Sequence, residues 1–197
     1  MILIAHGVKN KNDAKFALKK GYNYLEIDVA KRIIFTKFTI MHGAIPGKLG
    51  FGPTLETLLT SKYKSKLFLD IKHASYSFRF TSRIVKLLEL NKSQGIKICG
   101  PDWKVISNIC RQTHAYPFYT LKDKNSFKKI NQILPHIYKP SGFSINYKLI
   151  DEFLVRSLKS DYPNAQIWAW IVNHNDEVQR LQKLKIDGII TDNWRNQ

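Results

Sequence analysis

Strand-like and helix-like segments alternate along nearly the whole chain of 197 residues. Short apolar segments predict strands, and the amphipathic segments between them predict helices. We expect strands at residues 2–6, 24–29, 66–72, 96–99, 116–121, 142–146, 166–172 and 187–191, with a short extension at 38–42. We expect helices at 12–20, from Thr54, at 80–93, from Asp102 to 113, and at 126–134, 148–160 and 175–185. This alternation implies parallel strands joined by helical crossovers.

Eight strand–helix units predict an α/β fold of the (β/α)8 TIM-barrel type. The barrel would be lean, because the fold usually needs at least about 200 residues. The tail from Asn193 to Gln197 is too short for a full last helix, and almost no insertion follows the second strand. No low-complexity linker interrupts the chain, so we expect residues 1–197 to form a single domain. A doubly wound open sheet is the alternative, but no glycine-rich nucleotide-binding motif follows a strand.

The charge of the chain is strongly positive. Lys and Arg number 32 against 15 Asp and Glu, which gives a formal net charge of +17. Such a charge favours anionic partners, namely phosphate esters, anionic membrane surfaces or nucleic acid. The basic residues scatter along the chain instead of clustering on one element, so nucleic acid is the least favoured of the three. We expect a small anionic substrate, and the charge also allows a peripheral contact with an anionic membrane.

Neither a membrane span nor a secretion signal is visible in the sequence. No segment reaches the ~18 consecutive apolar residues of a transmembrane helix, and the first residues lack the longer apolar run of a signal peptide. We therefore expect a cytoplasmic protein. Cys99 and Cys110 are the only cysteines and form no C-x-x-C motif, so we expect two reduced, buried thiols.

Three carboxylates occupy alternating positions on two predicted strands. Glu26 and Asp28 share one strand face, and Asp70 shares a face with Lys72. In an antiparallel sheet such a face would simply contact water, but in a barrel it points inward. Carboxylates gathered in a low dielectric need a cation, and all-oxygen ligation suits Mg²⁺ or Ca²⁺. We therefore expect one divalent cation at Glu26, Asp28 and Asp70, with Lys72 near a bound phosphate.

Two histidines are predicted at strand ends. His6 ends the first strand and His42 ends the extension after the second. The carboxyl ends of barrel strands open on one face, where active sites lie, so the two histidines are candidates for acid–base catalysis. Trp170 is expected near the mouth of the barrel, and Trp168 one layer deeper in the core. Asp192, after the last strand, is interpreted either as a helix cap or as a partner of a site residue.

The order of these motifs resembles the glycerophosphodiester phosphodiesterase family over nearly the whole chain. The motifs are a strand ending in His6, then Gly21-x-x-x-x-Glu26-Ile-Asp28-Val29, His42-Gly43, Pro53-Thr-Leu-Glu56, Leu69-Asp70-Ile-Lys72, Trp168-Ala-Trp170-Ile-Val-Asn173 and Asp187-Gly-Ile-Ile-Thr-Asp192. The resemblance implies a TIM-type barrel that cleaves phosphodiesters with a divalent cation and two histidines. It places Glu26, Asp28 and Asp70 on the metal-ligand positions, His6 and His42 on the acid–base positions, Lys72 on the phosphate contact and Trp170 in the lining of the substrate pocket.

The sequence also departs from the family pattern. Gly7 follows the first histidine where the family has Arg, and Gly43 follows the second where it has Asp. Asp70 stands where a Glu is usual, and the insertion after the second histidine is nearly absent. The His-Gly pair and the Asp-x-Lys motif are also similar to the related sphingomyelinase D (phospholipase D) toxins, although the chain lacks their cysteine-bounded loop.

The resemblance implies hydrolysis of glycerophosphodiesters to an alcohol and glycerol 3-phosphate, with His6 as base and His42 as acid. One alternative is a phospholipase D-type lyase that forms a cyclic phosphate from lipid headgroups. Another is a non-catalytic barrel that binds phosphoesters or nucleic acid. The sequence does not choose between water and a hydroxyl of the substrate as the nucleophile.

Overall fold

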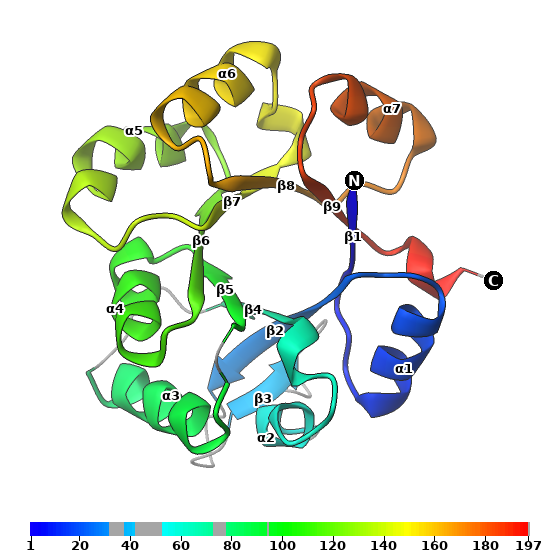
Figure 1. Cartoon of the computed structure of the whole chain (residues 1–197), viewed down its shortest axis with the longest axis vertical. Helices are drawn as coiled ribbons and strands as arrows, with labels where there is room; N and C mark the ends of the chain where they lie inside the picture. The colour runs from blue at the N-terminus through cyan, green and yellow to red at the C-terminus, as the bar shows by residue number, and fades with distance from the viewer. Residues whose placement is uncertain (32–37, 42–52, 73–77, 94, 197) are drawn as a thin grey trace.

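The computed structural model describes residues 1–31, 38–41, 53–72, 78–93 and 95–196. Eight parallel strands form a closed ring with helices around it, so the predicted (β/α)8 barrel is confirmed (Figure 1). The strands are β1 (Ile2–Ala5), β2 (Tyr24–Lys31), β4 (Leu67–Ile71), β5 (Lys97–Gly100), β6 (Tyr116–Leu121), β7 (Gly142–Asn146), β8 (Gln166–Trp170) and β9 (Gly188–Thr191). The ring runs in the order β1-β9-β8-β7-β6-β5-β4-β2, and the pairing of β1 with β2 closes it. A closed ring excludes the open doubly wound sheet.

The predicted extension at 38–42 is a further strand outside the ring. β3 (Phe38–Met41) pairs antiparallel with the last residues of β2, and Asp28 is the register partner of Met41. This short hairpin extends β2 at its carboxyl end. His42 lies outside the described residues, so its position stays a prediction.

The helices lie outside the ring and connect successive strands (Figure 1). They are α1 (Lys11–Lys19), α2 (Leu55–Leu59), α3 (Phe78–Leu90), α4 (Trp103–Thr113), α5 (Lys124–Gln132), α6 (Glu152–Asp161) and α7 (Asn175–Lys183). Four of them begin after a residue whose side chain accepts hydrogen bonds from free backbone N–H groups of the first turn, namely Asn10, Asp102, Asp123 and Asp151. The helix expected from Asp102 is α4, and Asp102 is its capping residue.

One predicted helix begins later than expected. The helix expected at 148–160 is divided into a 3-10 turn, η4 (Tyr147–Leu149), and α6. The side chain of Asn146 accepts from the N–H of Lys148 at 3.1 Å and so favours the separate turn, and Asp151 then starts α6 by accepting from Leu154 at 2.7 Å. At the end of the chain, the short 3-10 turn η5 (Asn193–Arg195) stands in place of a full helix, as expected.

Two apolar layers stabilise the barrel. The larger one lies between the strands and the surrounding helices. The smaller one fills the interior of the ring with Ile4, Phe68, Cys99, Phe118, Trp168 and Ile190. Trp168 is fully buried there, which confirms its predicted place in the core. A Cβ at Gly142 would lie 2.3 Å from the ring of Phe118, so only glycine fits at the start of β7 without a rearrangement.

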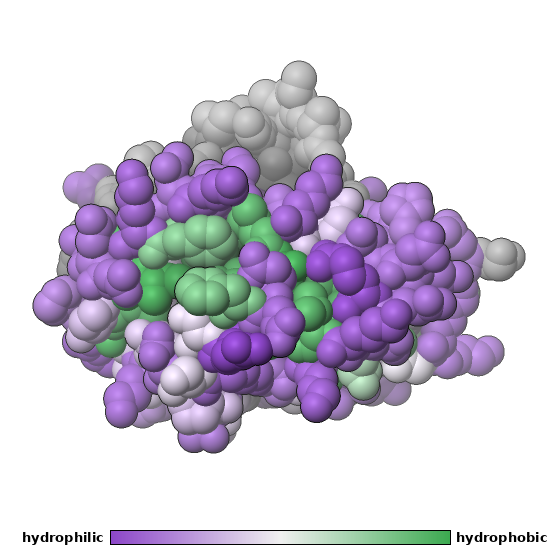
Figure 2. Space-filling model, turned by 90° about the horizontal axis from the view of Figure 1, so that it is seen from above, coloured by the Kyte–Doolittle hydropathy of each residue, from purple (hydrophilic) through white to green (hydrophobic). Residues whose placement is uncertain are grey.

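The face of the molecule seen in Figure 2 is mostly hydrophilic. Figure 2, which looks onto the molecule from the top of Figure 1, shows a limited apolar area surrounded by hydrophilic residues. In the described part of the chain, no helix combines the length and the apolar character that a membrane span requires. Cys99 and Cys110 are both free and buried, as expected from the sequence.

Candidate active site

The acids predicted on β2 and β4 point into the mouth of the barrel. Glu26 and Asp28 are only 3% and 8% exposed. Asp70 is the register partner of Asp28, and Phe68 is the partner of Glu26. Because Phe68 belongs to the interior apolar layer, this face of both strands is the inner one. The inward orientation of the carboxylates, which was inferred from strand alternation, is confirmed.

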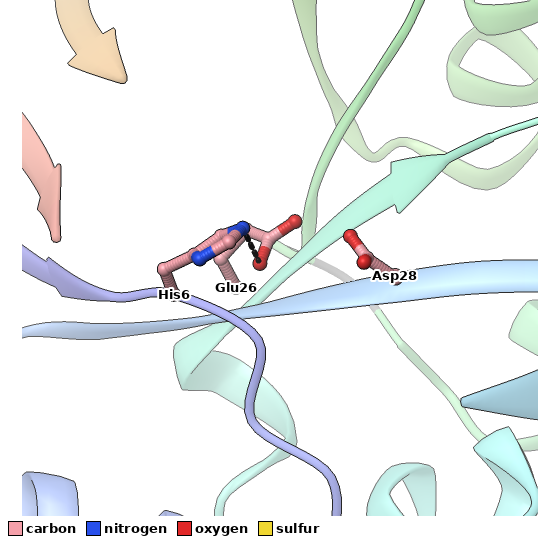
Figure 3. A group of neighbouring side chains, drawn as sticks. All are labelled: His6, Glu26 and Asp28. Atoms are coloured by element: carbon pink, nitrogen blue, oxygen red, sulfur yellow. Dashed lines mark ion pairs between the residues drawn. The ribbon is translucent and has the colours of Figure 1, made fainter. Parts of the chain in front are cut away.

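His6 forms a compact group with the two acids of β2 (Figure 3). One ring nitrogen of His6 and one carboxylate oxygen each of Glu26 and Asp28 lie within 4.8 Å of one another. The Nε2 of His6 is 3.8 Å from Oε2 of Glu26, beyond hydrogen-bond distance. Figure 3 shows the His6 ring, directly after β1, beside the carboxylate of Glu26 on β2, with Asp28 further along the same strand. Imidazole nitrogen and carboxylate oxygen both bind divalent cations, so the group has the composition of a metal site.

Lys72 neutralises the side of this group that faces β4. Its Nζ is 2.8 Å from Oδ1 of Asp28 and also forms an ion pair with Asp70. Burial lowers the pKa of Lys72, but the charges of Asp70, Glu26 and Asp28 outweigh that effect and raise it, so the ammonium stays protonated. The structure thus brings Lys72 and all three predicted acids together, but Asp70 faces Lys72 and is not part of the compact group with His6.

Glu26 is held at the centre of the group. Its Oε2 accepts a hydrogen bond of 2.8 Å from the backbone N–H of Gly7. Burial, followed by the charges of Asp28 and Asp70, raises the pKa of Glu26 well above its usual value. Neighbouring buried carboxylates become stable as anions only beside positive charge. The donor set and its electrostatics therefore fit a bound cation.

An acid from the other end of the chain orients the ring of His6. Asp192, directly after β9, lies 2.9 Å from Nδ1 of His6. Burial raises the pKa of Asp192, but the hydrogen bond from His6 and the charges of His6 and Arg195 outweigh it and lower the pKa. The ionised carboxylate can only accept, so Nδ1 carries the proton and Nε2 faces Glu26. Of the two interpretations of Asp192, the contact with a site residue is confirmed. Asp192 also occupies the cap position of the 3-10 turn at residues 193–195, but its side chain makes no capping hydrogen bond there.

The backbone of His6 is held by the same C-terminal turn. Trp194 Nε1 donates to the carbonyl of His6 at 2.8 Å, and Arg195 Nη2 donates to the same carbonyl at 2.7 Å and to that of Gly7 at 3.0 Å. The other terminal nitrogen of Arg195 pairs with Asp192. Residues 192–195 therefore fix both the ring and the backbone of His6. Sequence reasoning missed Trp194 and Arg195, since no motif marks contacts between the two ends of the chain.

Asn173 supports this arrangement by joining the ends of β8 and β9. Its Oδ1 accepts from Thr191 Oγ1 at 2.8 Å and from the N–H of Asp192 at 2.9 Å. Asn173 does not cap α7, because His174 occupies that position. The side chain of Asn173 instead fixes the backbone from which Asp192 reaches His6.

Some of these side chains line a cavity of about 460 Å³ at the carboxyl ends of the strands. Its volume falls in the range of small-molecule sites, roughly 300–1,000 Å³. His6, Glu26, Asp70 and Lys72 lie on one side, and Trp170 contributes to the wall near β8, where the sequence predicted it. Sequence reasoning did not single out the opposite side of the cavity, which β6, β7 and α5 form.

The barrel is shared by solved structures with low sequence identity. A glycerophosphodiester phosphodiesterase from Parabacteroides distasonis aligns with a TM-score of 0.75 and 17% identity, over 98% of this chain and 92% of its own. One from Thermotoga maritima aligns with a TM-score of 0.70 and 16% identity, over 98% and 96%. An Oleispira antarctica phosphodiesterase in complex with the product sn-glycerol-3-phosphate aligns with a TM-score of 0.71 and 14% identity, over 98% and 93%. At these identities, the likeness shows the common fold.

The sequence itself supplies the family assignment. A search of curated proteins finds no significant match. The profile of the glycerophosphoryl diester phosphodiesterase family matches residues 53–195, which is more than half of the chain. The matched segment includes Asp70, Lys72 and Trp170, while His6, Glu26 and Asp28 precede it and are placed beside it by the closed barrel. The chain therefore belongs to the glycerophosphoryl diester phosphodiesterase family of enzymes.

Proposed function

We propose that the protein hydrolyses glycerophosphodiesters to an alcohol and glycerol 3-phosphate with one divalent cation, Mg²⁺ or Ca²⁺. The observation that carries this proposal is the group of His6 with the buried Glu26 and Asp28, with Lys72 beside it. His6, Glu26 and Lys72 also line a cavity of small-molecule size. The family assignment supports the reaction class. The Oleispira antarctica phosphodiesterase, which binds sn-glycerol-3-phosphate as a product, supports the same product here.

Glu26, Asp28 and Asp70 would hold the cation. Carboxylate oxygens are the ligands that Mg²⁺ and Ca²⁺ prefer. The raised pKa of Glu26 supports this role, because burial and the neighbouring acids disfavour the anion in the absence of further positive charge. When bound, a divalent cation neutralises charge that develops on a phosphoryl oxygen in the transition state.

The residues around the cluster would bind the phosphate and move protons. Lys72 keeps its charge and would contact a nonbridging phosphate oxygen. His6 has its proton on Nδ1, held by Asp192, so Nε2 would take the proton of the attacking hydroxyl. His42 would protonate the leaving alcohol. This last role rests on the sequence motif, because His42 lies outside the described residues.

Turnover of glycerophosphocholine with Mg²⁺, with Ca²⁺ and with EDTA tests the proposal. Phosphorus NMR should show glycerol 3-phosphate as the product, and chelation should abolish its formation. Full activity after thorough chelation would rule out the metal role. A signal for a cyclic phosphate that persists would instead favour the phospholipase D-type lyase. No turnover together with tight binding of the diester would favour the non-catalytic barrel.

Several sequence-based expectations stay predictions. They are the single-domain organisation over residues 1–197, the cytoplasmic location, the low preference for nucleic acid and the peripheral contact with an anionic membrane. Binding to vesicles with and without anionic lipid, at low and high salt, would test the last of these, because the attraction of a basic surface to such lipids is screened by salt.

A further inference from the structure

The pocket wall opposite the carboxylates is polar and basic. In the ring, β6 and β7 lie across from β1 and β2. Thr120 of β6 and Ser144 of β7 are register partners, and both line the pocket. Two hydroxyl groups from neighbouring strands therefore lie side by side at the pocket wall, on the same inner face.

The two hydroxyls differ in their contacts with the surrounding protein. Ser144 is only 3% exposed and makes no hydrogen bond through its side chain with any described residue. Thr120 Oγ1 is buried and meets only the Cys99 thiol, a weak partner, without a hydrogen bond of normal geometry. Ser144 therefore presents a hydroxyl with no partner among the described residues at the pocket wall, where a ligand can form a hydrogen bond with it.

Two lysines lie at the edge of the same wall. Lys122 comes directly after β6, two residues beyond Thr120, and its ammonium forms no ion pair within the described part of the chain. Lys129 of α5 also lines the pocket, where its Nζ donates to the carbonyl of Pro101 at 3.0 Å. The one carboxylate that lines this side, Asp123, already accepts from the backbone and hydroxyl of Ser126 in the cap of α5. The wall therefore presents ammonium groups with donors to spare.

We infer that Thr120, Ser144, Lys122 and Lys129 form a subsite for a hydroxyl-bearing, anionic alcohol half of the substrate. The preferred diesters would then carry a second anionic group, such as a phosphate, beyond the scissile phosphodiester. This inference rests on the proposed phosphodiesterase activity and adds the substrate class to it. A choline group carries a positive charge, which the two ammonium groups repel.

Kinetics with three substrates test the subsite separately from the proposed phosphodiesterase activity. Glycerophosphoinositol and glycerophosphoinositol 4-phosphate differ by one phosphate, and glycerophosphocholine supplies a cationic alcohol. We expect kcat/KM to be about tenfold higher for the phosphorylated inositol diester than for the unphosphorylated one, the size of one charge-assisted hydrogen bond. Lys122→Gln and Lys129→Gln should each reduce that ratio, and the double variant should bring it close to one. Ser144→Ala should raise KM for both inositol diesters more than for glycerophosphocholine.

Lys64→Gln is the matched control. Lys64 donates to the carbonyl of Asn91 at 3.0 Å, as Lys129 does to that of Pro101, but it does not line the pocket. Lys64→Gln should leave the ratio of kcat/KM between the two inositol diesters unchanged. Turnover with equal rates for the three substrates, or with glycerophosphocholine preferred, would overturn the subsite and leave the proposed function standing. No turnover of any of them with Mg²⁺ or Ca²⁺ would overturn the proposed function and the subsite together.

Discussion

The two ends of the barrel interior use the same strands for different purposes. At the amino end, the rings of Phe68, Phe118 and Trp168 pack together, with centroids 4.4–5.3 Å apart. At the carboxyl end, the interior holds acids, lysines and hydroxyls around an open pocket. Apolar packing contributes to stability in proportion to the area it buries, while buried charge costs free energy unless it is paired.

The change from one end to the other takes only two residues along a strand. On β4 the inner face changes from Phe68 to Asp70, and on β6 it changes from Phe118 to Thr120. Because alternate residues share a face, each strand contributes one side chain to the packed layer and the next one to the site. Substitutions at the two ends should therefore have opposite signatures in activity and in stability, and the following variants test that separation.

The largest effect is expected at the carboxyl end, from Glu26→Gln and Asp28→Asn. Each substitution removes one negative charge of the proposed metal site and keeps the shape of the side chain. We expect kcat/KM to fall about 10³-fold, while the melting temperature stays the same or rises because like-charge repulsion is relieved. Steady-state kinetics and thermal unfolding measure the two. Glu152→Gln, which removes an exposed acid paired with Arg156, is the control and should change neither. A Glu26→Gln variant with a lower melting temperature but unchanged kcat/KM would reverse the comparison.

Trp168→Ala should give the opposite signature at the amino end. It removes a fully buried ring from the packed layer, and large-to-small substitutions of this kind cost about 3–5 kcal/mol. Urea unfolding should show this loss, with kcat per folded molecule nearly unchanged. Trp170→Ala, two residues further on β8, is expected to do the reverse, with a small loss of stability and a raised KM. Equal losses of activity from both variants would mean that the two layers are not separable.

Asp192→Asn tests whether the orientation of His6 matters for chemistry. The amide can donate to Nδ1, which would move the ring proton to Nε2 and remove the proposed base. We expect kcat to fall about 10–100-fold with little change in KM. Asp187→Asn is the counterpart at the amino end, where Asp187 accepts from Lys159 and from the N–H of Ile167. Asp187→Asn should lower stability without changing kcat. If Asp192→Asn had the same kcat as the parent protein, Asp192 would have no role in the chemistry.

Local patterns were enough to predict the barrel and most of the site. The alternation of strands and helices predicted the parallel ring, and the alternation within β2 and β4 predicted the inward carboxylates. Both depend on residues close together in the sequence, for which the side-chain periodicity is fixed by the backbone. The position of Trp168 below Trp170 follows from the same periodicity.

The missed features depend on contacts that form only when the barrel closes. The partners of His6 come from residues 192–195, which meet it through the pairing of β1 with β9. The proximity of Lys72 to Asp70, by contrast, was predicted from their shared strand face, and the ion pair between them confirms it. The later start of α6 came from a local competition, in which the side chain of Asn146 bonds to the backbone and favours a separate turn.

The chain offers a matched pair of arginines for a smaller effect. Arg195 pairs with Asp192, three residues earlier, and donates to the carbonyls of His6 and Gly7. Arg180 likewise pairs with Glu177 and donates to the carbonyls of Ile150 and Tyr147, away from the pocket.

Arg195→Gln and Arg180→Gln should therefore cost similar stability, about 1–3 kcal/mol each. Only Arg195→Gln should also lower kcat, by roughly tenfold, because it releases the backbone of His6 and the carboxylate that orients its ring. Urea unfolding and steady-state kinetics on both variants separate the two effects, and added guanidinium should restore part of the kcat of Arg195→Gln. If the two variants lost kcat equally, the turn at residues 192–195 would have no special role in the site.

The smallest expected effect concerns Cys99, which lies on the boundary between the two ends. Its side chain belongs to the packed layer and also lines the pocket. Burial, followed by the charges of Asp70 and Glu26, raises the pKa of Cys99 well above its usual value, and burial also raises the pKa of Cys110. Because the thiolate is the reactive form, both cysteines should resist alkylation at neutral pH until the protein unfolds. Mass spectrometry after a timed exposure to iodoacetamide, with and without urea, measures this. If Cys99 in the folded protein were alkylated much faster than Cys110, Cys99 would belong to the open pocket and not to the packed layer.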